Sequence, residues 1–194
     1  MRNLKLPSLL LAALLGASAL HAQDEPEPAG RYRKYEPTAR SFSCEIPSRG
    51  WHAFEEDSVQ GYAVHILGPD SPTGTYRAGI DIHWVERGQS GYMDYKKAID
   101  VQRRSDAAAE RKASPVRLMR VAGMNARVFE VTETRLLPPD RLPAAPEVLH
   151  HYVAILPSGD SYFLIRLSST RDSYLDHRDE FVRFLKHFRV LGYK

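Results

Sequence analysis

The stretch YFLIRLSSTRDSYLDHRDEFVRFLKHFRV, residues 162–190, holds the two clearest elements of the sequence, a strand followed by a helix. Residues 162–168 form a short apolar run that is typical of a buried strand. From residue 173 onward the apolar residues follow a helical period, and Ser173 with Asp176 fits a capping box at its start. The apolar stripe of this helix comprises Tyr174, Leu175, Phe181, Val182, Leu185 and Phe188. We expect this amphipathic helix to pack on a sheet rather than insert into a membrane.

Upstream of this stretch, short apolar or alternating runs separated by turn residues indicate further strands. These runs span residues 42–46, 51–54, 62–67, 78–85, 116–121, 124–134 and 148–156. Turns are predicted at residues 122–123 and 157–160, and a second helix at 91–112 with Ser90 as its N-cap. Strands that come in runs, with helices between the runs, predict an α+β fold. We expect one domain over residues 41–194, with a central antiparallel sheet flanked by helices.

The first 40 residues lack the pattern of a folded domain. Arg2 and Lys5 precede an apolar run over residues 9–20, which is shorter than the about 20 residues of a membrane-spanning helix and is followed by Ala22. We therefore predict a signal peptide at residues 1–22 and a periplasmic or secreted protein, with a retained N-terminal anchor as the alternative. Residues 23–40 are acidic and proline-rich and then basic, which predicts a flexible tether.

The composition excludes several classes of protein. The chain has 194 residues, of which 43% are hydrophobic and 26% charged, and this argues against a disordered chain or a polytopic membrane protein. The formal net charge is +3, and loss of Arg2 and Lys5 with the signal peptide would reduce it to +1. Such a balanced charge does not indicate a nucleic-acid partner. After cleavage we expect no transmembrane segment. The sequence does not indicate an oligomeric state.

The chain contains a single cysteine, Cys44, so a disulfide cannot form within it. Cys44 alternates with Phe42 and Ile46 on the predicted buried face of a strand. We expect a small core residue, with an exposed thiol or an intermolecular disulfide as the alternative.

Two parts of the sequence resemble PsbP-like proteins. Phe42, Ile46 and Pro47, followed by Trp51, resemble the opening strand, turn and strand of that family, and residues 162–167 with 181–190 resemble its closing strand and helix. The resemblance spans residues 41–191 and implies a PsbP-type α/β/α sandwich, as in bacterial DcrB-like envelope proteins and a eukaryotic Ran-binding factor. It also implies a domain that binds partners rather than a catalyst. The shared residues are core and turn positions, so they carry over no ligand-binding residue.

No catalytic motif is present, and the sequence indicates no cofactor. The candidate metal ligands are Asp81, His83, His150 and His151. Asp81 and His83 are two apart on a predicted strand and therefore share a face, whereas adjacent His150 and His151 point to opposite faces, so that only one of them could join a site. A mixed histidine and carboxylate site would suit zinc, copper or nickel, and the alternative is that these residues form a solvated polar face.

These observations predict an exported, non-catalytic binding or accessory domain of the cell envelope that interacts with a protein partner or a small ligand. The candidate contact surfaces are the exposed side of the helix at 91–112 and the long loop at 138–147. The alternative is a metal-binding protein or a metal-dependent hydrolase that uses the aspartate and histidines named above. A deep pocket with converging polar groups would favour ligand binding, and a flat surface would favour protein contacts.

Overall fold

The structure is a computed structural model that describes residues 30–39, 41–58, 61–140 and 142–191. The predicted signal peptide lies outside these residues. The helical elements are α1 (Tyr95–Arg103), the short 3-10 turn η1 (Arg171–Ser173) and α2 (Tyr174–His187). The strands are β1 (Tyr32–Tyr35), β2 (Phe42–Pro47), β3 (His52–Ser58), β4 (Gly61–Asp70), β5 (Arg77–Val85), β6 (Lys112–Ala113), β7 (Arg117–Val121), β8 (Met124–Leu137), β9 (Ala145–Ser158), β10 (Ser161–Thr170) and β11 (Arg189–Val190).

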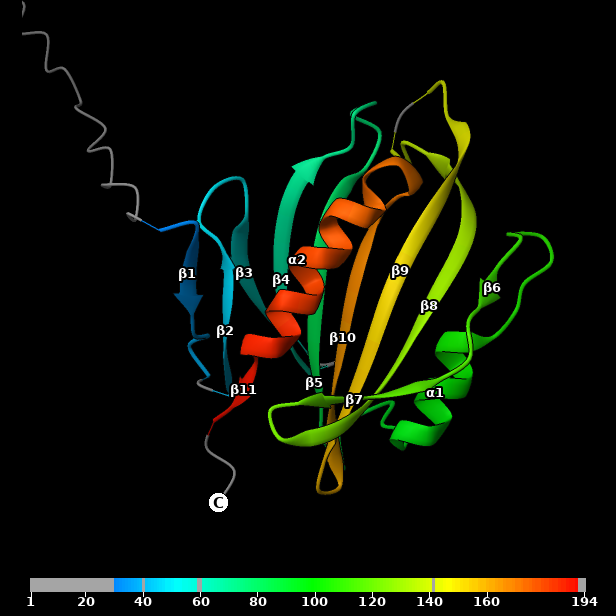
Figure 1. The fold of residues 1–194 in the computed structure, drawn as a ribbon. Helices are drawn as coiled ribbons and strands as arrows, with labels where there is room; N and C mark the ends of the chain where they lie inside the picture. The colour runs from blue at the N-terminus through cyan, green and yellow to red at the C-terminus, as the bar shows by residue number, and fades with distance from the viewer. Residues whose placement is uncertain (1–29, 40, 59–60, 141, 192–194) are drawn as a thin grey trace, which may run out of the picture.

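The body of the molecule is one antiparallel sheet with the strand order β3-β4-β5-β10-β9-β8, which β6 and β7 extend by pairing with β8 (Figure 1). A smaller antiparallel sheet, β1-β2-β11, stands beside α2. The two predicted turns are confirmed. Gly159 has a φ of 61° between β9 and β10, and Ala122 and Gly123 have φ values of 50° and 78° between β7 and β8. Tight hairpin turns require positive φ values of this kind.

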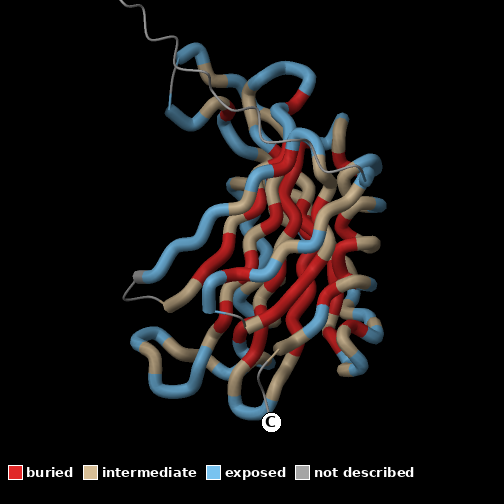
Figure 2. The backbone as a smooth tube through the Cα atoms, turned by 90° about the vertical axis from the view of Figure 1, so that its left-hand side faces the viewer, coloured by how far each residue is buried: buried red, intermediate tan, exposed pale blue. Residues whose placement is uncertain are grey.

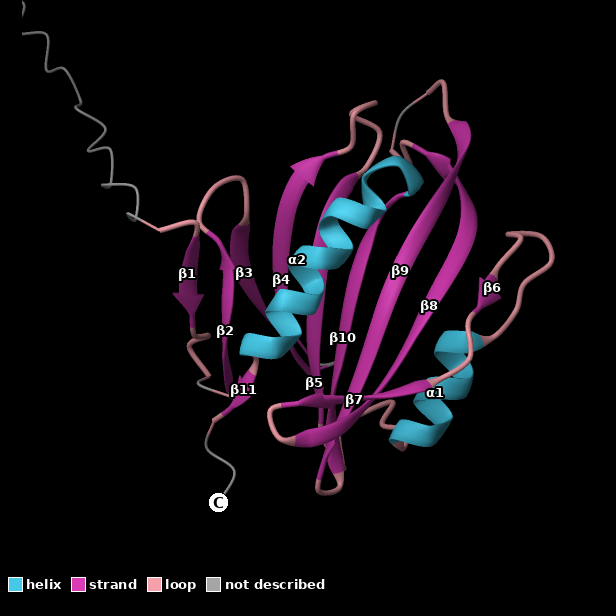
Figure 3. Ribbon diagram, in the orientation of Figure 1, coloured by secondary structure: helices cyan, strands magenta, loops and turns pink. Residues whose placement is uncertain are grey.

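Helix α2 lies across one face of the main sheet, as the amphipathic pattern predicts (Figure 3). Its buried residues Phe181, Leu185 and the following Phe188 pack against a core that includes Phe163 and Ile165 of β10. The predicted stripe differs from the structure at two positions. Leu175 is 67% exposed, whereas Phe184, outside the predicted stripe, is buried. Leu175 lies on the flank of the helix, because the line of buried residues follows the spacing 174, 181, 184, 185 and 188.

The starts of both helices differ from the predictions. The hydroxyl of Ser173 caps no helical N–H, because η1 precedes α2 and places this hydroxyl 3.4 Å from the carbonyl of Thr170 instead. Helix α1 is capped by Asp94 rather than by Ser90, with one carboxylate oxygen accepting from the backbone N–H groups of Lys96 and Lys97 at 2.9 and 3.2 Å. A carboxylate at this position satisfies donors that the first helical turn leaves free.

Helix α1 is also shorter than the predicted helix at 91–112. It ends at Arg103, and Asp106 then accepts a hydrogen bond from the backbone N–H of Ala108, which favours a turn over a further helical turn. With nine residues α1 is about 13 Å long, whereas the 14 residues of β9 extend over about 45 Å. It therefore covers only part of the sheet face opposite α2, and the sheet is more dominant than in the helix-flanked sandwich that we expected. Figure 2 shows the buried residues concentrated along the strands.

The described part of the predicted tether is ordered into strand β1. Tyr32–Tyr35 pairs with β2, and the Tyr32 hydroxyl donates to Glu180 of α2 at 2.9 Å. The Arg183 guanidinium lies 3.9 Å from the centre of the Tyr32 ring, a cation–π contact. The tether prediction therefore does not hold for these residues, because aromatic contacts with α2 offset their ordering entropy. No helix in the described part of the chain is both long and apolar enough to cross a membrane.

Cys44 is 2% exposed, which confirms its predicted place in the core. Burial raises the pKa of its thiol, so the thiol stays protonated and unreactive at neutral pH.

Candidate functional site: a groove beside α1

The sheet face opposite α2 carries an unusual set of polar side chains at the centre of the sheet. In β5 and β10 every second residue points to this face, and the pairing register places Arg166 opposite Asp81 and Leu164 opposite His83. Further along β10, Ser168 shares this face with Arg166, and it pairs with His151 of β9. Because α1 covers only part of the face, these residues border two cavities.

The first cavity is a groove between α1 and the sheet, with a volume of about 510 Å³. Helix α1 contributes one wall, with Ala98, Val101 and Gln102, and the sheet contributes the floor. The loop between β5 and α1 closes one side. The remaining lining residues are Tyr62, His83, Trp84, Val85, Gln89, Ser90, Gly91, Tyr92, Met93, Tyr162, Leu164 and Arg166. The lining is therefore mainly apolar and aromatic, with a few polar groups, as in sites that bind small ligands.

Arg166 lies where the groove meets the second cavity. One of its Nη atoms donates to the Asp81 carboxylate at 3.0 Å, while its Nε is buried and has no hydrogen-bond partner among the described residues. Asp81 is also held by Nδ1 of His65 at 2.8 Å. Burial would raise the pKa of Asp81, but the hydrogen bonds from His65 and Arg166 outweigh it, so the net shift is downward and the carboxylate stays ionised.

His83, the other sequence-predicted residue on β5, lines the groove beside these groups. Its ring centre lies 6.0 Å from that of His65. Burial lowers the pKa of His83, so its imidazole is uncharged at neutral pH. In this state it offers one hydrogen-bond donor and one acceptor to the groove.

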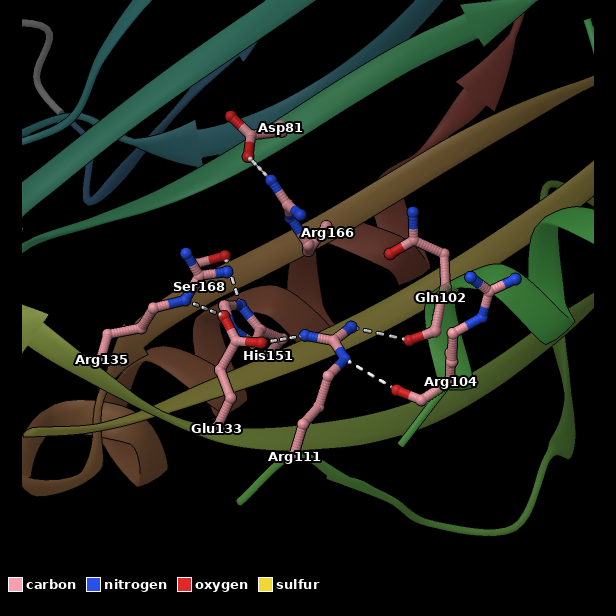
Figure 4. A network of polar contacts seen from close by, with 9 residues as sticks. All are labelled: Asp81, Gln102, Arg104, Arg111, Glu133, Arg135, His151, Arg166 and Ser168. Atoms are coloured by element: carbon pink, nitrogen blue, oxygen red, sulfur yellow. Dashed lines mark hydrogen bonds and ion pairs between the residues drawn. The ribbon is translucent and has the colours of Figure 1, made fainter. Parts of the chain in front are cut away.

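The second cavity, of about 300 Å³, borders a buried charged cluster that Figure 4 shows from close by. Glu133 of β8 lies at the centre of this charged cluster. Its side chain is 4% exposed and forms ion pairs with Arg111 and with Arg135, the latter at 2.7 Å. His151 lies 3.5 Å from Glu133 through Nε2 and 2.8 Å from the Ser168 hydroxyl through Nδ1. The contact with His151 and the hydrogen bonds from Arg135 and Arg111 lower the pKa of Glu133 despite its burial, so this carboxylate is ionised at neutral pH.

Arg111 connects this cluster to the groove. Besides Glu133, its guanidinium contacts the backbone carbonyls of Gln102 at 2.8 Å and Arg104 at 3.1 Å (Figure 4). These carbonyls belong to the last turn of α1, where the helix leaves acceptors free and favours a cation. Arg111 thus clamps the C-terminal end of the helix, which forms one wall of the groove, to β8.

The structure brings only some of the sequence-predicted site residues together. Asp81 and His83 share a face, but His150 and His151 point to opposite faces: His150 contacts the Tyr174 ring of α2 at 4.7 Å, and His151 belongs to the Glu133 cluster. Asp81 is paired with Arg166 and with His65, neither of which is among the candidate metal ligands predicted from the sequence. Within the described ranges, no group of three histidine, cysteine or acidic side chains is arranged to hold a metal ion. The metal site stays a prediction without support from the geometry.

Sequence reasoning did not identify Arg166, Arg111 or Glu133 as site residues. The signal for Arg166 was readable, since it is the one charged residue inside an apolar strand over residues 162–167. Arg111 carried no such signal, because it stands between Glu110 and Lys112, and Glu133 stands between two threonines in a strand of mixed composition. The pairing of Glu133 with Arg111 depends on how β8 meets the loop after α1.

The structure is similar in fold to solved structures of very different sequence. A crystal structure from Bacteroides thetaiotaomicron matches with a TM-score of 0.52 and 12% identity over 84% of this chain, which spans 50% of that protein. The cyanobacterial PsbP (CyanoP) of Synechocystis gives a TM-score of 0.46 and 12% identity, covering 82% of this chain and 92% of that one. The Ran-binding protein Mog1p of Saccharomyces cerevisiae gives 0.48 and 11%, covering 83% and 96%. No family model and no curated protein matches the chain.

At these identities the similarity concerns the fold alone. The Bacteroides structure shares it, and the chain spans about half of that protein's length. The PsbP and Mog1p structures match with TM-scores below 0.5, so the resemblance to PsbP-like proteins stays a prediction from the sequence.

Proposed function

We propose that this protein is a non-catalytic binding domain that holds a small ligand in the groove between α1 and the main sheet. The observation that carries the proposal is the groove itself, with about 510 Å³ of space and a mainly apolar lining that includes the polar groups of His83, Gln102 and Arg166. Pockets that bind small molecules have volumes of about 300–1,000 Å³ and this kind of lining. A ligand would bury its body against the apolar floor and orient itself by the polar groups.

The two carboxylates near the groove favour binding rather than catalysis. Asp81 is committed to His65 and Arg166, and Glu133 to two arginines. A general acid or base needs a pKa near the working pH, whereas both carboxylates have lowered pKa values. The Ser168 hydroxyl next to His151 belongs to a residue that is 5% exposed, so it is poorly placed to meet a substrate.

We further propose that the domain is a PsbP-like or DcrB-like member of the cell envelope, exported by the segment at residues 1–22. The basic start, the short apolar run and Ala22 support export. Mass spectrometry of the protein from its own cells tests this: an N-terminus at residue 23 is expected, and a retained Met1 in the cytoplasmic fraction would overturn it.

The groove is tested with phenylnaphthylamine, an uncharged dye that fluoresces when it enters an apolar site. The purified protein should bind the dye, and Val101→Trp should abolish the signal, because Val101 lines the groove and is 37% exposed, so a larger side chain fills the space. Lys96→Trp is the matched control, since Lys96 lies on α1 but outside the lining. Equal binding by both variants, with unchanged circular dichroism, would overturn the proposal.

A further inference from the structure

We infer that the groove selects ligands with an apolar body and a single anionic group, such as a carboxylate, sulfonate or phosphate, which Arg166 binds. This inference rests on the proposed function and narrows it to one class of ligand. Three features of the groove carry it: the charge of its lining, the unused donors of Arg166 and the distribution of its apolar residues.

The charge of the lining is carried by one residue. Among the described residues that line the groove, Arg166 alone holds a full charge at neutral pH, since His83 is uncharged and the others are apolar or neutral polar groups. The Asp81 carboxylate is outside the lining, where it forms an ion pair with Arg166 and a hydrogen bond with His65. The charged group that a ligand meets in the described lining is therefore the Arg166 guanidinium, with Asp81 behind it.

Arg166 also keeps donors for a ligand. A guanidinium has five N–H donors in a planar fork, and the structure commits one Nη to Asp81. The buried Nε without a partner is a costly arrangement, because an unsatisfied buried donor has lost its water and gained nothing in return. The Arg166 side chain is 39% exposed, so an anionic group of a ligand would meet the accessible Nη donors and form charge-assisted hydrogen bonds with them.

The rest of the groove suits an apolar body. Val85, Tyr162 and Leu164 lie on the sheet side, and Met93 and Val101 lie on the other side. Gln102 of α1 lines the same groove as Arg166. The amide donors of Gln102 can therefore add to the recognition of an anion. This separation of one charged end from an apolar remainder is the basis for the ligand class.

The test uses two dyes that share a phenylnaphthylamine skeleton and differ by one sulfonate: anilinonaphthalene sulfonate, the anionic probe, and phenylnaphthylamine, the neutral probe. We expect Arg166→Gln to weaken binding of the anionic probe about ten- to a hundredfold, the range for loss of hydrogen bonds to a charged group. Binding of the neutral probe should change by less than about twofold. Arg120→Gln, an exposed arginine outside the groove, is the control and should affect neither probe.

A freed Asp81 carboxylate could itself repel the anionic probe in the Arg166→Gln variant. The comparison of Asp81→Asn with the double variant Asp81→Asn, Arg166→Gln removes this explanation, because neither contains that charge. The double variant should still bind the anionic probe at least about tenfold more weakly than Asp81→Asn. Should an Arg166 variant fail to fold, salt titration of the wild-type protein replaces it: binding of the anionic probe should weaken with ionic strength, and that of the neutral probe should not.

The outcomes separate this inference from the proposed function. If the neutral probe binds in the groove but Arg166→Gln affects the two probes equally, selection of an anionic group is refuted and the binding function stands. If neither probe binds the wild-type protein, both proposals fail.

Discussion

Replacing Glu133 by glutamine tests whether the buried charged cluster holds the wall of the groove in place. The side chain of Glu133 is 4% exposed, and its two oxygens contact Arg111, Arg135 and His151. Glutamine keeps the size of the side chain and removes the negative charge. The substitution therefore leaves the arginines without their counter-ion, and Arg111 is the more affected of the two because it is the less exposed.

The expected cost follows from the exposure of the partners. Removing one partner of a buried ion pair costs about 3–5 kcal/mol. The lower end applies here, because Arg111 is 20% exposed and keeps the carbonyls of Gln102 and Arg104, and Arg135 is 60% exposed and can be hydrated. We expect a loss of about 3 kcal/mol in the free energy of unfolding, which for a domain of this size lowers Tm by about 6–12 °C.

The assay is urea denaturation of wild type and variant at neutral pH and in acid. The pKa of Glu133 is lower in the folded state than its ordinary value of 4.5, so its contribution to stability is present above pH 4.5 and is lost as the pH falls through the folded-state pKa. The glutamine variant has no such titration. The difference between the two proteins should therefore be largest at neutral pH and should shrink progressively below pH 4.5.

The control is Arg135→Gln, which removes an exposed partner of the same carboxylate and should cost less than about 1 kcal/mol. If Glu133→Gln costs no more than this control, or if its cost does not depend on pH, then the carboxylate does not hold the cluster together and the argument fails.

Two further substitutions test the local structure, one at the start of α1 and one on the sheet face that packs against α2. Asp94→Ala should destabilise the protein by about 1 kcal/mol and speed hydrogen exchange in α1, because it removes the acceptor of two N–H groups in the first helical turn. The control is Asp100→Ala, which is also on α1 but is not a cap. Equal exchange rates in the two variants would contradict the capping role of Asp94. Gly68→Ala should lower the free energy of unfolding, measured by urea denaturation, by about 1–3 kcal/mol, because the new Cβ would lie 2.9 Å from the buried Trp51 ring. Gly79→Ala is the control and should be tolerated, since its closest contact would be at 3.4 Å. Equal losses of stability in the two variants would argue against overpacking at Gly68.

Much of the fold was predictable from local patterns, and the failures have identifiable causes. The apolar run of β10, the α2 stripe apart from Leu175 and Phe184, and the turn at Gly159 depend on neighbouring residues, and the structure confirms them. The predicted length of α1 was wrong because the carboxylate of Asp106 favours a local turn, and the charged and alanine residues of 103–112 are equally compatible with a helix. The strand β1 was missed because its stabilising contacts are with α2, about 150 residues away in the sequence.

The candidate site likewise has features that the sequence predicts and features that only the folded structure shows. The sequence by itself determined that Asp81 and His83 share one strand face and that His150 and His151 do not, because side-chain direction alternates along any strand. Only the tertiary structure decided that Asp81 meets Arg166 and that Glu133 meets Arg111, since each pair depends on which strands or loops become neighbours. Which strands become neighbours is decided by how the whole sheet buries its apolar residues, and every strand contributes to that burial. A local sequence pattern therefore does not predict these pairs. The groove exists for the same reason: its floor, wall and arginine come from separate segments that only the folded sheet brings together.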